Sequence, residues 1–201
     1  MQKKIRRIRN SALLIIIAAL PLLFSGCGYN KMVTLDEGVS AAWAQVENVY
    51  QRRMDLIPNL VETVKGYAAH EQDTFTELAE ARSRAGGVMN IDEDLLNDPE
   101  AFARFQQTQD SLGTALQRLL VVTENYPELK ANQNFLALQD QLEGTENRIA
   151  VERMRFNEAV RTYNTTIRRF PQSIIANMTG FEKKPYFESA DGAETAPEVK
   201  F

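Results

Sequence analysis

The stretch FLALQDQLEGTENRIAVERMRFNEAVRTYNTTIRRF, residues 135–170, decides the fold, because large apolar residues recur in it every seven positions. A strict seven-residue repeat keeps one apolar stripe of a helix facing its neighbours over the whole length of the helix. The pattern predicts one long helix over residues 128–170, ended by Pro171. The repeating residues are Phe135, Leu142, Ile149, Phe156, Tyr163 and Phe170.

Three more helices are predicted upstream of this one. Thr34 and Glu37 have the spacing of a capping box, which marks the start of a helix. Pro58 is interpreted as the start of the second helix, because proline is accepted in a first helical turn but breaks a helix interior. Gly86-Gly87 marks the end of that helix, and Asp98-Pro99 marks the start of the third.

The sequence therefore predicts an all-α fold with no strand. We expect an up-and-down antiparallel four-helix bundle over residues 34–170, in which the last helix is the long one. The alternative is three long helices, of which the first is kinked at Pro58. After Pro171 the pattern is lost, so residues 171–201 are expected to form an extended, partly disordered tail.

The N-terminus has the layout of a bacterial lipoprotein signal. Basic residues come first, then the apolar run Ala12–Phe24, then Ser25-Gly26 just before the only cysteine, Cys27. The run has 13 residues, fewer than the ~20 that cross a bilayer as a helix. We expect a signal peptide over residues 1–26, acylation of Cys27 (palmitate) and a spacer over residues 27–33. The alternative is an uncleaved, single-pass anchor over residues 11–29.

The net charge bears on the class of partner, and the cysteine content bears on disulfide formation. The net charge is −4 and becomes −9 without the five basic residues of the signal. An acidic body repels phosphate backbones, so no nucleic acid partner is expected. A single cysteine excludes an intramolecular disulfide, and acylation would consume an exported thiol.

Two stretches resemble the LemA family, and the resemblance covers about residues 29–188. The first is Ala42–Asn48 followed by QRRMDLIPNLVETVKGY at residues 51–67. The second comprises Tyr163-Asn164, Phe170-Pro171, Ile175-Ala176 and Tyr186-Phe187-Glu188. The resemblance implies a helical bundle that is anchored at its N-terminus with its body outside the cytoplasm. It implies no reaction, and it makes an envelope protease or another membrane protein a candidate partner.

One polar cluster is a candidate for partner docking. It surrounds the predicted helix junction, where Asp55 is three residues from Arg52 and within reach of its guanidinium. The alternative is a charge-paired junction in which an amide side chain satisfies the broken turn. The candidate docking residues are Arg52, Arg53, Asp55, Pro58 and Asn59.

The sequence gives no support for an enzyme. The only histidine, His70, lacks the further His or Cys ligands of a zinc or di-iron site. Asp73, Glu77 and Glu80 share one helical face with no apolar surroundings, which favours a solvated face over acid/base chemistry. We expect no catalytic residues, no metal and no cofactor.

The leading functional prediction is a membrane-anchored, non-enzymatic scaffold or adaptor for envelope proteins, located outside the cytoplasm. Its support is the anchor, the long coiled-coil-like helix and the lack of a catalytic set. The alternative is an envelope protein that binds a small ligand in an apolar pocket of the bundle, lined by Trp43, Tyr50, Tyr67 and Phe75. The identity of the partner and the choice between inner and outer membrane stay open.

Overall fold

The computed structural model describes residues 2–89 and 95–188, and the side chains of residues 28–88 and 95–188. These residues form helices and no strand, which confirms the predicted all-α fold. No described helix is apolar over a length sufficient for a membrane crossing. The helices are α1 (Gln2–Lys65), α2 (Gln72–Met89), α3 (Pro99–Thr123), α4 (Pro127–Lys130), α5 (Gln133–Arg168) and α6 (Gln172–Thr179).

The chain divides into two compact units, and α1 and α5 contribute to both. The first unit contains the chain up to Ser40 and Ala159–Lys183. The second unit contains Ala41–Glu158 and the chain from Lys184 onward.

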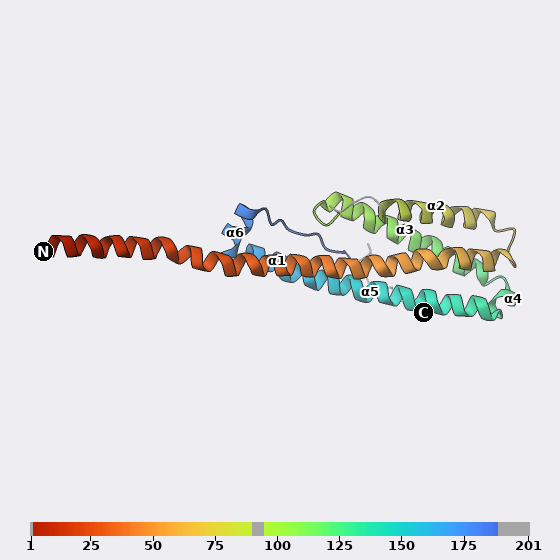
Figure 1. Cartoon of the computed structure of the whole chain (residues 1–201). Coiled ribbons are helices and arrows are strands. Elements are labelled where there is room, and N and C mark those ends of the chain that lie inside the picture. Colours follow the sequence, from red (N-terminus) through yellow and green to blue (C-terminus); the bar gives the residue numbers. More distant parts are fainter. Residues whose placement is uncertain (1, 90–94, 189–201) are drawn as a thin grey trace, which may run out of the picture. The chain divides into compact units, whose positions relative to one another are not determined.

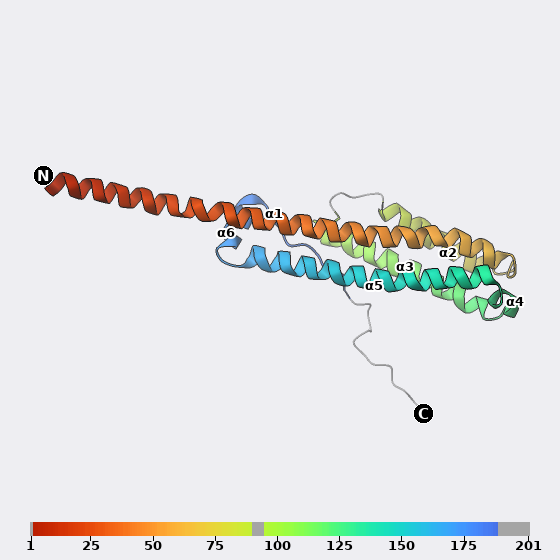
Figure 2. The same cartoon turned by 60° about the horizontal axis from the view of Figure 1, so that its bottom comes forward.

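The second unit is an up-and-down bundle in which successive long helices reverse direction. Figures 1 and 2 show α2 and α3 side by side, with the segments of α1 and α5 that belong to this unit running along them. Its core draws apolar residues from α1 to α5. Its largest fully buried members include Ile57, Leu60, Leu78, Leu112, Leu119 and Phe135.

The predicted start of α3 is confirmed. The Asp98 carboxylate Oδ1 accepts hydrogen bonds from the backbone N–H groups of Glu100 (2.8 Å) and Ala101 (3.1 Å), and Pro99 follows it in the first turn. Phe102 and Phe105, on the apolar face of this helix, are buried.

The predicted helix boundary at Pro58 is wrong, because α1 continues through Pro58 to Lys65 and the second helix begins at Gln72. Proline has no N–H, so Pro58 cannot donate to the carbonyl of Met54 one turn earlier. Arg82 of α2 replaces that donor, since its Nε donates to Met54 O at 3.3 Å. A contact from a neighbouring helix therefore lets α1 accommodate an interior proline.

Two other predicted helix ends in the first half of the chain are also wrong. Thr34 does not begin a helix, because residues 27–33 already lie inside α1 and its hydroxyl donates back to Asn30 O at 2.9 Å. Gly86-Gly87 does not end α2, which reaches Met89. Gly86 allows a close approach instead, because a Cβ there would lie 3.3 Å from Met54 Cε.

The predicted long helix is interrupted at its beginning. A short α4 precedes α5, and Asn132 caps α5 through its side-chain oxygen, which accepts from the N–H groups of Asn134 (2.9 Å) and Phe135 (3.1 Å). The tail also differs from the prediction, since it begins with α6, which ends at Thr179 and is followed by Gly180 with a φ of 79°. The disorder expected near the C-terminus concerns residues 189–201, which lie outside the described residues.

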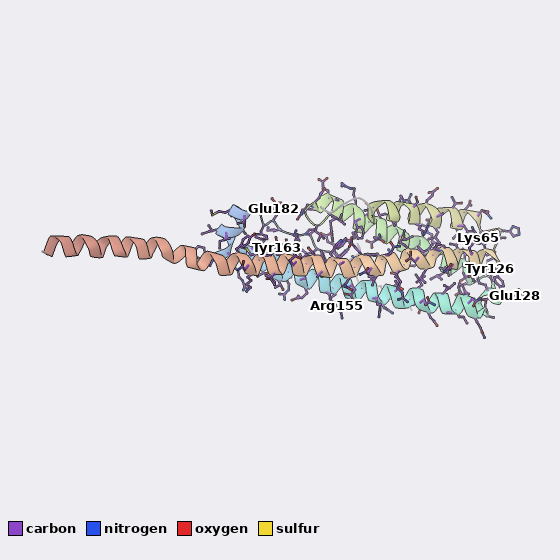
Figure 3. All side chains as sticks on the ribbon, viewed as in Figure 1. Lys65, Tyr126, Glu128, Arg155, Tyr163 and Glu182 are labelled. Atoms are coloured by element: carbon purple, nitrogen blue, oxygen red, sulfur yellow. The ribbon has the colours of Figure 1, made fainter. Side chains whose placement is uncertain are left out.

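The first unit has a small core of its own. Met32 and Val39 of α1 are buried there, together with Val160, Tyr163 and Ile167 of α5. Burial, together with the nearby carboxylates of Asp36 and Glu182, raises the pKa of Tyr163, labelled in Figure 3, to about 12.

Candidate functional site

Arg53 is the one predicted docking residue that is buried, with 3% of its surface exposed. Its Nη2 donates to the main-chain oxygen of Gln109 at 3.1 Å and to the side-chain Oε1 of the same residue. Its Nη1 pairs with Glu146 Oε1 at 3.3 Å. Arg53 of α1 therefore connects α3 and α5 inside the second unit.

The other four predicted docking residues are exposed: Arg52, Asp55, Pro58 and Asn59. Asp55 accepts a hydrogen bond from Gln51 Nε2 at 2.7 Å, which is a different partner from the predicted Arg52. The structure does not bring Arg53 onto the same surface as these four residues. Their role in docking stays a prediction.

The four aromatic residues proposed to line a ligand pocket lie in different surroundings. Trp43 packs against other rings, Phe75 lies in the apolar core, and Tyr67 is 40% exposed and accepts from Asn132 Nδ2 at 2.9 Å. Tyr50 is buried against Phe105, and burial raises the pKa of its hydroxyl, with Arg153 and Arg53 opposing the shift. These residues do not line a common pocket, so nothing in this arrangement supports the ligand-binding alternative.

The polar residues considered for catalysis are exposed or lie near basic side chains. His70 is exposed, Glu77 forms an ion pair with Arg118, and Glu80 lies 4.0 Å from Arg84. Within the described side chains, no group of three or more His, Cys, Asp or Glu residues is arranged to hold a metal ion. The side chain of Cys27 lies outside the described residues.

The most specialised site in the second unit is a groove between α3 and α5 that holds the segment Lys184–Glu188, which we call the C-terminal strap. The strap is neither helix nor strand. Its Phe187 is 5% exposed and inserts into a ring cluster, with centroid distances of 4.8 Å to Phe102, 5.5 Å to Phe156 and 6.0 Å to Trp43. A single aromatic side chain therefore anchors the strap.

Two amide side chains bind the backbone of the strap on both of its edges. Asn157 of α5 donates through Nδ2 to Phe187 O and accepts through Oδ1 from Phe187 N, both at 2.9 Å. Gln106 of α3 does the same for Glu188, donating to its O at 3.0 Å and accepting from its N at 3.1 Å. Buried or half-buried backbone groups need such partners. These four bonds recognise main chain, so they set a path without requiring a particular side chain.

Arg153 adds the selective contact. Its guanidinium lies over the Phe187 ring, 4.6 Å from the centroid, and its Nη2 donates to Glu188 O at 2.9 Å. Its Nη1 lies 3.6 Å from Asp110 Oδ1 of α3, which holds the guanidinium in place. A cation over a ring favours an aromatic residue at the position of Phe187.

The groove is larger than the strap that it holds. On the α3 side an open hollow of about 760 Å³ is lined by residues such as Gln107, Ser111 and Tyr186. On the α5 side a second hollow of about 500 Å³ is lined by Ile149, Ala150 and Met154, the last of which is 66% exposed. Both hollows include Glu188 in their lining. Neither is lined by the four aromatic residues of the ligand-binding alternative.

Together, the fold and the groove define an all-α protein whose helical bundle holds an extended segment. A family model described as LemA family matches residues 42–201, and the chain belongs to that family. The match confirms the resemblance found in the sequence.

Proteins of two kinds are among the relatives. The magnetosome protein MamQ of Magnetospirillum gryphiswaldense is 29% identical over 182 residues, which cover 83% of this chain and 67% of that protein. Magnetosome protein MamQ 2 of Paramagnetospirillum magneticum has the same identity and coverage. Protein LemA of Metamycoplasma hominis is 19% identical over 162 residues, covering 81% of this chain and 69% of that protein.

Proposed function

We propose that the protein is a membrane-anchored, non-enzymatic scaffold of the cell envelope that binds an extended segment of a partner protein in the groove between α3 and α5. The N-terminal residues anchor it, through acylation of Cys27 or through a retained anchor, and the helical body lies outside the cytoplasm. The observation that carries the proposal is the paired amide recognition of the strap backbone by Gln106 and Asn157.

The chemistry of the groove suits a peptide ligand. Main-chain hydrogen bonds provide affinity for any extended segment, and the ring cluster under Arg153 provides selectivity for an aromatic residue. The open hollows on both sides of Glu188 leave room for a segment longer than the strap. A partner segment and the strap would compete for the same contacts, so the strap limits binding to partners that match the site well.

Site-specific crosslinking in intact cells of the native host tests the proposal. A photoreactive amino acid replaces Gln107, an exposed residue that lines the groove, and in a matched control it replaces Asp140, which is exposed on α5 outside both hollows. We expect discrete protein adducts from position 107 that are absent from position 140.

Two substitutions sharpen the result. Phe187→Ala removes the internal competitor and is expected to increase the adducts from position 107. Adding Asn157→Ala to that variant removes main-chain hydrogen bonds from the groove and is expected to reduce them again. Identical adducts from both positions, or adducts that respond to neither substitution, would contradict the proposal.

A further inference from the structure

We infer that α6 makes a second contact with the membrane, in which an apolar stripe beside the anchor lies on the lipid surface. The stripe consists of Phe170, Ile174 and Met178, which are 81%, 53% and 82% exposed. Ile174 and Met178 are four residues apart and therefore lie on one face of α6, and Phe170 is in the turn that precedes α6. Large apolar side chains gathered at such exposures indicate a surface that is covered in the working protein.

The opposite face of α6 is fixed against α1 within the first unit. A Cβ built on Gly28 would lie 3.2 Å from Ile175 Cδ1, so glycine allows the two helices to approach closely. Ala176 is 2% exposed, and the ring of Phe181, just after α6, lies 5.8 Å from the ring of Tyr29. The stripe therefore keeps a fixed position relative to residues 28 and 29 of α1.

That position is at the membrane surface in either form of the anchor. If Cys27 is acylated, Gly28 is the first residue after the lipid-bearing one. If residues 11–29 are a retained anchor, Gly28 is the second-last residue of that anchor, four residues or about 6 Å along a helix from the end of the apolar run at Phe24. The headgroup layer is about 5–7 Å thick on each side of a bilayer. The inference rests on the anchoring that is part of the proposed function.

The charges around the stripe fit a lipid surface better than a protein partner. Three basic residues next to the stripe in sequence are exposed: Arg168 and Arg169 just before Phe170, and Lys183 after α6. The acidic residue nearest to the stripe in sequence is Glu182. Basic residues that flank an apolar face are typical of helices that lie in the interface of membranes with anionic lipids. The partner is accordingly a bilayer that contains anionic phospholipid.

Fluorescence quenching by brominated lipid tests the inference with the full-length protein in vesicles of phosphatidylcholine and phosphatidylglycerol. Met178→Trp places a tryptophan on the stripe, and Leu136→Trp, a residue 45% exposed in the second unit, serves as the matched control. The emission of the native Trp43 is measured in the unaltered protein and subtracted. We expect brominated lipid to remove most of the added emission of Met178→Trp and little of that of Leu136→Trp.

Flotation of the same vesicles separates the two possible failures. If the protein floats with the vesicles and Met178→Trp is not quenched, the membrane contact of α6 is refuted and the anchoring stands. If the protein does not float, the anchoring is refuted and the contact of α6 with it. A Met178→Trp emission that is blue-shifted without quenching, together with a crosslinked dimer, would assign the stripe to a second copy of the chain and also refute the inference.

Discussion

Phe187→Ala is expected to detach the C-terminal strap and to lower the free energy of unfolding by about 2–3 kcal/mol. The ring is 5% exposed, and burying a phenylalanine contributes about 1.5–3 kcal/mol. The guanidinium of Arg153 over the ring adds about 0.5–1 kcal/mol. Without the ring, the four hydrogen bonds from Gln106 and Asn157 no longer offset the entropy of ordering the strap, which costs about 1–2 kcal/mol per residue.

The expected loss of stability is smaller than the loss that Phe→Ala typically causes in a closed core, which is about 3–5 kcal/mol. A closed core keeps the cavity that the substitution creates, whereas the strap belongs to no helix and can leave the groove. The freedom that the strap regains compensates for part of the lost burial. The size of the effect therefore distinguishes a detachable segment from an ordinary core residue.

Trp43 makes the effect measurable, because it is the only tryptophan and its ring is stacked near Phe187, with an interplanar angle of 20°. Denaturant unfolding of the full-length protein in detergent, followed by Trp43 emission, gives the stability and the state of the groove together. For Phe187→Ala we expect a red-shifted Trp43 emission of the native state and an unfolding midpoint at a lower denaturant concentration. Tyr186→Ala, at a strap residue 42% exposed, is the control and should change the stability by less than about 0.5 kcal/mol.

Two results would refute this reasoning. If Phe187→Ala leaves both the native Trp43 emission and the midpoint unchanged, the ring does not anchor the strap. If it costs about 5 kcal/mol or more with an unchanged native emission, Phe187 is a closed-core residue and the strap does not detach.

Three other predictions concern the contact of Arg82 with α1, the buried hydroxyl of Tyr163 and the N-terminal anchor. Arg82→Met should lower the free energy of unfolding by about 1 kcal/mol because it leaves Met54 O without a donor. In the Pro58→Ala background residue 58 regains its N–H, so the same substitution should cost less there. Urea unfolding of both backgrounds with and without Arg82→Met measures the difference. The pKa of Tyr163 is raised to about 12 in the folded state, so the stability that the protonated hydroxyl contributes is complete below pH 10 and is lost as the pH rises toward 12. Tyr163→Phe should therefore make the melting temperature less dependent on pH in that range. An unchanged dependence would contradict the raised pKa of Tyr163. Intact mass from native membranes should show a chain that lacks residues 1–26 and carries acyl chains, both lost in Cys27→Ser; a full-length, unacylated mass of the unaltered protein would instead identify a retained anchor over residues 11–29.

The sequence predicted the helices better than it predicted their ends. Apolar periodicity and the Asp98-Pro99 cap are local signals, and the buried faces of α3 and α5 agree with them. The continuation of α1 through Pro58 depends on Arg82, which lies 24 residues further along the chain and in another helix. No local pattern contains that contact, so the sequence alone does not distinguish a helix that ends at Pro58 from one that continues through it with a kink.

The groove could not be predicted for a similar reason. Its polar residues, Gln106 and Asn157, are unremarkable on a helix surface until a backbone segment lies against them. Phe187 lies in a tail without periodicity, and its place in the Tyr186-Phe187-Glu188 match to the LemA family does not reveal what its ring contacts. For Arg53 a signal did exist, since it lies seven residues from both Val46 and Leu60, which are buried on the same stripe of α1.

The position of Arg53 gives it a structural role next to the groove. Its partner Gln109 is three residues from Gln106 on α3, and its partner Glu146 is seven residues from Arg153 on α5. Arg53 therefore fixes the spacing between α3 and α5, the two walls of the groove. It does so one to two helical turns away from the residues that hold the strap. The ion pair between Asp110 and Arg153 joins the same walls directly. None of these contacts involves the strap, so the groove should keep its width when the strap leaves, which a site that binds partner segments requires.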